Sequence, residues 1–156
     1  MIGSDLLIAL PFTPGQVATV VVDDVTGIDV DQTAVDLGVF TIPFKCAVHE
    51  AGLVVTETNA GTTPGVVDFD LLSVAGGLSG TRGSADIAHF LLGTTAAGKV
   101  LYDKAAAGTI LYPGQEVVVQ LTTQPVTGPA GHVRPYLLVK QIAETDANLS
   151  AKVLTA

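Results

Sequence analysis

Three Pro-Gly pairs divide this chain, and each comes before a run of residues that favour strands. Proline fixes φ at the first corner of a turn, and glycine adopts the positive φ of the second corner. The β-branched valines that follow are restricted at χ1 and suit a pleated sheet. The sequence therefore predicts turns followed by strands, at Pro14-Gly15 before 17–22, Pro64-Gly65 before 66–69 and Pro113-Gly114 before 117–121.

A further strand is indicated by strict alternation between Phe40 and Val48, which places five apolar residues on one face. Pro43 interrupts it and cannot donate to a ladder, so we expect an edge or a bulge there. A short turn at His49–Gly52 is expected to connect this strand to a partner at 53–58.

More strands are predicted at 66–73, 99–102, 109–112, 116–123 and 134–142. The segment 85–92 fits a short helix or a strand, and its Gly-rich flanks favour the strand. About eight strands without sustained helical periodicity predict an all-β fold, an antiparallel β-sandwich that is jelly-roll-like.

A chain of 156 residues is expected to form one domain. We divide it into an arm at 1–13, a β-sandwich domain at 14–143 and a tail at 144–156. The arm is either an edge strand on its own core or a segment that docks on a neighbouring subunit. Pro11 and Pro14 prevent a helix in the arm. Its candidate partner-binding residues are all apolar, and they are Leu6, Leu7, Ile8, Leu10 and Phe12.

Charged residues make up 14% of the chain, whereas about 25% is typical. A surface with few charges is weakly protected against association. The formal charge of −8 and the scattered basic residues argue against a nucleic-acid partner. The apolar stretch 6–10 is too short for a signal sequence or a membrane span, so no membrane partner is predicted.

The residues that could carry chemistry form no recognised motif. Cys46 and His49 lack two further zinc ligands nearby, and Cys46 falls on an apolar strand face. Asp68 and Asp70 share one strand face, where a solvated surface is expected rather than a glycosidase pair. No nucleophile elbow or phosphate-binding loop is present. We therefore predict neither an enzyme nor a cofactor.

Five aspartates lie close together in one loop-rich stretch: Asp23, Asp24, Asp29, Asp31 and Asp36. Asp29 and Asp31 could supply two oxygen ligands to Ca²⁺, but the offsets of an EF-hand are missing. A charged surface loop is the favoured interpretation, and Ca²⁺ binding stays open.

Several segments resemble the small β-rich head proteins of tailed bacteriophages. The similarity extends over about two-thirds of the chain, and the segments that carry it are Ile42-Pro43-Phe44-Lys45, 98–103, 111–119, and 137–139 with Ala147-Asn148. The resemblance implies a capsid decoration (cement) protein, which sits on the shell as a trimer or dimer and braces adjacent capsomers. It does not decide between a decoration protein and another virion component.

The predicted function is thus that of a structural virion protein on the capsid surface, made in the host cytoplasm. Its predicted partners are the major capsid protein and copies of itself. The alternative is a carbohydrate- or receptor-binding module that uses the Gly/Thr-rich loops at 59–65, 76–83 and 125–132. The low aromatic content, with three tyrosines and no tryptophan, argues against this alternative.

Overall fold

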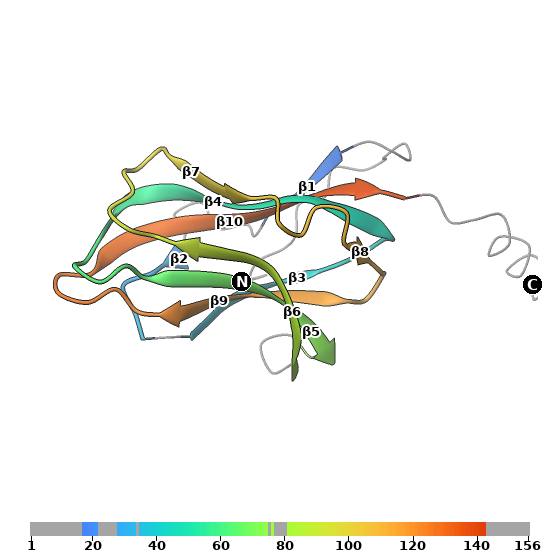
Figure 1. Ribbon diagram of the computed structural model, residues 1–156, viewed down its shortest axis with the longest axis horizontal. Helices are drawn as coiled ribbons and strands as arrows, with labels where there is room; N and C mark the ends of the chain where they lie inside the picture. The colour runs from blue at the N-terminus through green and yellow to red at the C-terminus, as the bar shows by residue number, and fades with distance from the viewer. Residues whose placement is uncertain (1–16, 22–27, 34, 75, 77–80, 143–156) are drawn as a thin grey trace, which may run out of the picture.

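The structure is a computed structural model, and it describes residues 17–21, 28–33, 35–74, 76 and 81–142. Figure 1 shows strands in two layers that face each other. In the described part of the chain the strands are β1 (Val17–Val21), β2 (Ile28–Asp29), β3 (Val35–Thr41), β4 (Cys46–Ala60), β5 (Val66–Val74), β6 (Thr81–Leu91), β7 (Val100–Asp103), β8 (Ile110–Leu111), β9 (Glu116–Thr123) and β10 (Ala130–Gln141). Within the same residues, no helix is long and apolar enough to cross a membrane.

The strands form a six-stranded and a four-stranded antiparallel sheet. The first has the order β1-β10-β4-β7, with β2 also paired to β10 and β8 also paired to β4, and the second has the order β3-β9-β5-β6. β1 and β2 follow one another along β10, as β7 and β8 do along β4. Each of these two pairs is therefore one interrupted strand.

Counted in this way, the ten strands occupy eight positions in chain order. The six-stranded sheet then has the order 1-8-3-6 and the four-stranded sheet the order 2-7-4-5. This is the connectivity of a double-sheet jelly roll. The predicted all-β sandwich of about eight strands is confirmed.

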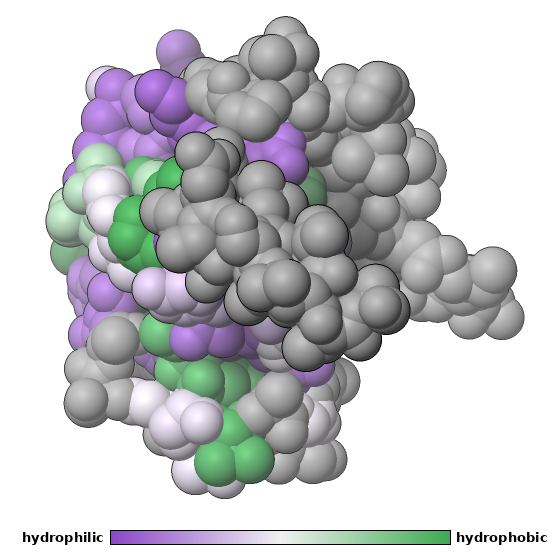
Figure 2. All heavy atoms as spheres, turned by 90° about the vertical axis from the view of Figure 1, so that its right-hand side faces the viewer, coloured by the Kyte–Doolittle hydropathy of each residue, from purple (hydrophilic) through white to green (hydrophobic). Residues whose placement is uncertain are grey.

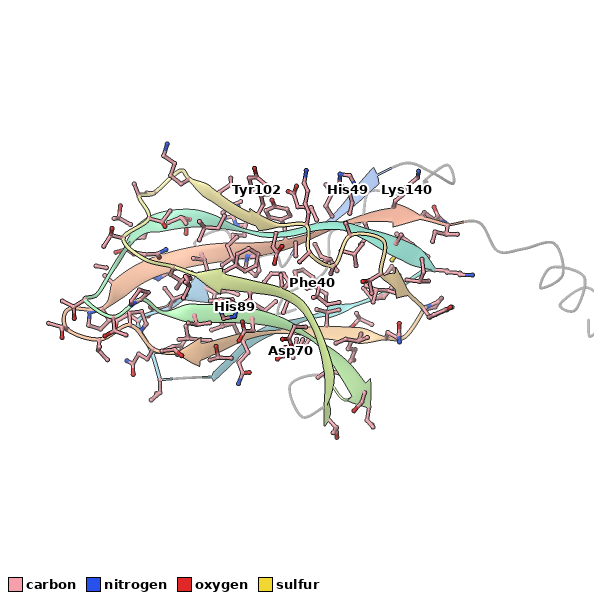
Figure 3. All side chains as sticks on the ribbon, in the orientation of Figure 1. Phe40, His49, Asp70, His89, Tyr102 and Lys140 are labelled. Carbon is pink, nitrogen blue, oxygen red and sulfur yellow. The ribbon has the colours of Figure 1, made fainter. Side chains whose placement is uncertain are left out.

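The core lies between the two sheets, and its large aromatic side chains come from the four-stranded one. The Phe69 ring of β5 lies 5.8 Å from the Phe40 ring of β3 and 5.6 Å from the Phe90 ring of β6, between centroids. Figure 3 shows Phe40 between the layers. The six-stranded sheet contributes smaller aliphatic side chains, among them Leu53 and Leu137. Burial of this apolar surface drives folding.

Three glycines with similar positive φ form the turns that precede β7, β8 and β9. Gly98, Gly108 and Gly114 have φ values of 82°, 91° and 85°. Gly114 donates its N–H to Ile42 O, and Ile42 donates its own N–H to Gln115 O. This is a glycine bulge that closes a type II turn. The turn predicted at Pro113-Gly114 is confirmed.

The other two Pro-Gly pairs have different outcomes. Gly65 does not have a positive φ, so the turn predicted at Pro64-Gly65 is wrong. Gly65 is buried, and a Cβ on it would lie 2.7 Å from Cγ of Pro125. Glycine is needed there for close packing. Pro14-Gly15 lies outside the described residues.

The alternating segment from Phe40 to Val48 is not one strand. Its first residues end β3 in the four-stranded sheet, and Cys46 begins β4 in the six-stranded sheet. Pro43 lies in the crossing, where a residue without an N–H leaves no gap in a ladder. The apolar residues still contact the core, because the same side of the segment faces the core in β3, in the crossing and in β4.

The turn predicted at His49–Gly52 is also wrong, because β4 continues without a turn to Ala60. The register of β4 against β10 shifts between Leu138 and Val139, which are opposite Glu50 and Val48. His49 is the extra residue of this bulge. Elsewhere, the strand favoured at 85–92 is confirmed by β6, and the predicted boundaries of β9 are confirmed. The arm, the tail and both domain boundaries lie outside the described residues.

A candidate interaction surface on the six-stranded sheet

The residues that the sequence singled out are not brought together in one site. The five arm residues, Leu6, Leu7, Ile8, Leu10 and Phe12, lie outside the described part of the chain, as do Asp23 and Asp24. Asp29 accepts a hydrogen bond from the N–H of Asp31 at 2.6 Å, so its carboxylate holds its own turn. Among the described residues, no group of three His, Cys, Asp or Glu side chains could hold a metal ion. The charged surface loop favoured for this stretch stays a prediction.

Cys46 and His49 point to opposite sides of β4. Cys46 is buried in the core, and this burial raises the pKa of its thiol to about 11. His49 is exposed and lies on the outer side of the six-stranded sheet (Figure 3). Their spacing in the sequence therefore does not create a shared metal site.

The outer face of the four-stranded sheet is acidic. Asp68 of β5 lies 2.6 Å from Nδ1 of His89, and its second oxygen accepts a hydrogen bond from the Thr122 hydroxyl at 2.9 Å. Asp70 follows two residues later on the same side (Figure 3). These bonds link β5 to β6 and β9 across the outer face, which matches the surface role expected for the two aspartates.

Two tyrosines form a row across the outer face of the six-stranded sheet. Tyr102 of β7 pairs with Gly52 of β4, and Gly52 pairs with Tyr136 of β10. A Cβ on Gly52 would overlap the Tyr136 ring, so the absence of a side chain at Gly52 leaves the space that this ring occupies. The row therefore depends on a glycine in the middle of a long strand.

Glu50 connects the members of this row. It accepts a hydrogen bond from the Tyr136 hydroxyl at 2.6 Å, and Nζ of Lys104 lies 3.6 Å from its other oxygen. Lys104 Nζ also lies 5.7 Å from the centre of the Tyr102 ring, within cation–π range. Burial, together with the Glu50 carboxylate, raises the pKa of Tyr136, so its hydroxyl remains a donor even at a pH where an exposed tyrosine ionises.

The edge of this sheet that β7 and β8 form is also apolar. Val100, Tyr102, Ile110 and Tyr112 are 47%, 64%, 39% and 51% exposed, and they make up four of the seven large hydrophobic residues that are exposed in the described chain. Nζ of Lys45 lies 5.5 Å from the centre of the Tyr112 ring. We call the strands β7 and β8 together with Tyr112 the β7–β8 edge.

A second hydrophobic area is visible at the bottom of Figure 2, on the side where β5 and β6 project in Figure 1. Val74, at the end of β5, is 60% exposed. The β7–β8 edge consists of described residues throughout.

Sequence reasoning did not identify the tyrosine row. Tyr102 and Tyr136 are far apart in the chain, and they lie in one row only because β4 pairs with both β7 and β10. One signal was present: Gly52 lies inside an apolar run, where a glycine often marks the close approach of another group.

Comparisons with known proteins bear on the fold. No protein-family model matches the chain, and no curated protein matches it. Among solved structures, the chain is similar to one described as "Capsid of Ralstonia phage GP4", with a TM-score of 0.61 and 23% sequence identity. The likeness covers 89% of this chain and 92% of that one. The chain therefore has a fold that also occurs in a phage capsid.

Proposed function

We propose that this chain is a structural component of a bacteriophage capsid, which decorates the shell and braces adjacent capsomers. The observation that carries the proposal is the likeness to a phage capsid chain over nearly the full length of both. Two chains that share a fold over most of their length can occupy similar places in a shell. The resemblance of 98–103 and 111–119 to phage head proteins supports the same role.

The surface chemistry supports a protein that works by contact. The chain has few charged residues, and the β7–β8 edge exposes apolar side chains to solvent. Exposed apolar patches mark interaction sites. On a shell, repeated attachment multiplies modest affinities, so a small contact surface on each copy is sufficient. The proposed partners are the major capsid protein and further copies of this chain.

The proposal is tested with shells of the phage that encodes the chain, assembled with and without it. We expect the purified protein to sediment with shells that lack it and to raise the temperature at which they release their DNA. A protein that stays in the supernatant at saturating concentration, or that leaves the release temperature unchanged, would contradict the proposal.

The arm is the proposed contact to the shell. We expect deletion of residues 1–12 to leave a folded domain that no longer sediments with shells. A matched control is the substitution of Val126 by Ser, which removes an exposed apolar side chain outside the arm. Equal binding by the truncated and full chains would exclude the arm.

The tyrosine row favours a second candidate function, a carbohydrate-binding module on the virion. Sugars stack on exposed aromatic rings, and Glu50 and Lys104 place a polar acceptor and donor beside Tyr102. Two of the predicted loops also meet, because Thr63 bridges to Val126. Binding on a glycan array that is lost in Tyr102→Ala supports this function; no signal with the intact protein excludes it.

A further inference from the structure

The β7–β8 edge has free backbone groups as well as apolar side chains. β7 pairs with β4 on one side, and within the described residues no strand pairs on the other side. At its start, Val55 donates its N–H to Lys99 O and accepts from Gly98 N. Because the direction of hydrogen bonding alternates along an antiparallel strand, Val100 and Tyr102 direct their N–H and C=O groups away from β4.

An uncovered edge of this kind is a template for a further strand. Proteins usually protect such an edge with charges or proline along it, but here the two outward-bonding residues, Val100 and Tyr102, are apolar and exposed. The charges lie at its two ends instead, Lys99 before β7 and Asp103 at its last residue.

The sequence of this edge is complementary to itself when read in the opposite direction. The five residues are Lys99-Val100-Leu101-Tyr102-Asp103. If a second copy is laid antiparallel with Leu101 opposite Leu101, Lys99 faces Asp103 of that copy and Val100 faces its Tyr102. Opposite charges and aromatic–β-branched pairs across strands are both favourable, and each occurs twice by symmetry.

The hydrogen-bonding direction agrees with this register. The register places Val100 opposite Tyr102 of the second copy, and the N–H and C=O groups of both residues are directed away from β4. Lys99, Leu101 and Asp103 alternate with them, so they share the other face of the strand. Asp103 uses one carboxylate oxygen to accept the N–H of Ala105 at 2.7 Å, which fixes the side chain at the end of the strand.

We propose that β7 pairs antiparallel with β7 of a second copy across a two-fold axis at Leu101, which joins two six-stranded sheets into one. The pairing goes beyond the proposed capsid role and is a property of the free protein, so its test does not depend on shells. A strand of this length buries less surface than a stable interface of roughly 1,200 Å² requires. The dimer is therefore weak in dilute solution and is favoured where copies are concentrated.

The test is a disulfide trap between single-cysteine variants of the full chain. Lys99→Cys and Asp103→Cys are mixed and oxidised with glutathione. Residues opposite each other in such a pair lie about 4.5 Å apart between Cα atoms, within the range of a disulfide. Lys99 and its own symmetry mate are four residues apart along the strands, or about 13 Å, too far to be bridged. Cys46 is buried with a raised pKa and contributes little background.

We expect a disulfide-linked dimer from the mixture and none from either variant alone. A mixture of Lys99→Cys with Val126→Cys, another exposed position, is the matched control. The pairing is overturned if this control, or either variant alone, gives as much dimer as the Lys99–Asp103 mixture.

A charge exchange provides a second, independent measurement, and circular dichroism checks that each variant folds. Asp103→Lys places two lysines opposite each other, so the dimer seen by sedimentation velocity at high concentration should be lost. Adding Lys99→Asp restores opposite charges and should restore the dimer, although the Asp103 bond to Ala105 is absent in both variants. A double variant that remains as monomeric as the single one overturns the register.

Discussion

The two sheets of this jelly roll use their aromatic residues in opposite ways. In the four-stranded sheet, Phe40, Phe69 and Phe90 point inward and meet ring to ring in the core. In the six-stranded sheet, Tyr102 and Tyr136 lie on the outer face, and Tyr112 follows β8 at its edge. The difference suggests that the four-stranded sheet supplies the large aromatic side chains of the core, whereas the six-stranded sheet presents an aromatic surface.

Charge divides the molecule in the same way. The strands of the four-stranded sheet carry five acidic residues (Asp36, Asp68, Asp70, Asp86 and Glu116) and one basic residue (Arg82). The strands of the six-stranded sheet carry four acidic residues (Asp29, Glu50, Glu57 and Asp103), and five basic residues lie on them or directly beside their ends (Lys45, Lys99, Lys104, Arg134 and Lys140). The strands of the four-stranded sheet thus carry a net charge of −4, whereas those of the six-stranded sheet with their flanking residues carry +1, so less like-charge repulsion opposes association at the β7–β8 edge.

The largest expected effect tests the aromatic contrast directly. Phe69 is fully buried between two other rings, so Phe69→Ala should lower the free energy of unfolding by about 3–5 kcal/mol. Urea denaturation followed by circular dichroism measures the change. The matched substitution on the other sheet is Tyr102→Ala, which should cost less than about 1 kcal/mol because the ring is mostly exposed. Similar losses in the two variants would contradict the contrast between a buried aromatic cluster in one sheet and exposed aromatic rings on the other.

The next effect sharpens the account of the tyrosine row. In Gly52→Ala the new methyl group would displace the Tyr136 ring, and we expect a loss of about 1–3 kcal/mol from overpacking. The double variant Gly52→Ala/Tyr136→Ala removes the clash, so it should be more stable than the sum of the two single changes predicts. A strictly additive result in urea denaturation would show that the ring does not depend on Gly52.

These residues also show what the sequence could and could not predict. The alternation in 66–73, the strand-forming valines of 116–123 and the turn at Pro113-Gly114 were sufficient for the sandwich, because they depend on local backbone preferences. The crossing at Pro43 was missed because alternation shows which side chains face the core but not which sheet carries them. Tyr102 and Tyr136 were missed as a pair because only long-range strand pairing brings them together. The arm residues stay a prediction.

A smaller effect concerns the connection between the two sheets. Gly114 lies in the turn from β8 to β9 with a φ of 85°, and a Cβ there would meet nothing within 4 Å. Gly114→Ala should therefore cost about 1–2 kcal/mol from backbone strain alone. Gly114→Asn should cost less, because asparagine tolerates the left-handed region. Thermal unfolding of both variants checks this, and equal losses would show that the strain is not of backbone origin.

The smallest effect has the opposite sign and compares one polar side chain from each sheet. Asp68, on the four-stranded sheet, has bonds to Thr122 and His89, whereas Asn59 on β4 is 1% exposed and neither of its amide atoms has a hydrogen-bond partner among the described residues. Leucine has the same branched shape as asparagine without its polar atoms, so Asn59→Leu should raise the free energy of unfolding by about 1 kcal/mol. Asn59→Ala is the control and should lower it, because it leaves a cavity. A loss of stability in Asn59→Leu as large as that in Asn59→Ala would mean that the Asn59 amide is hydrogen-bonded in the folded protein. The polar side chains of the two sheets would then not differ in this respect.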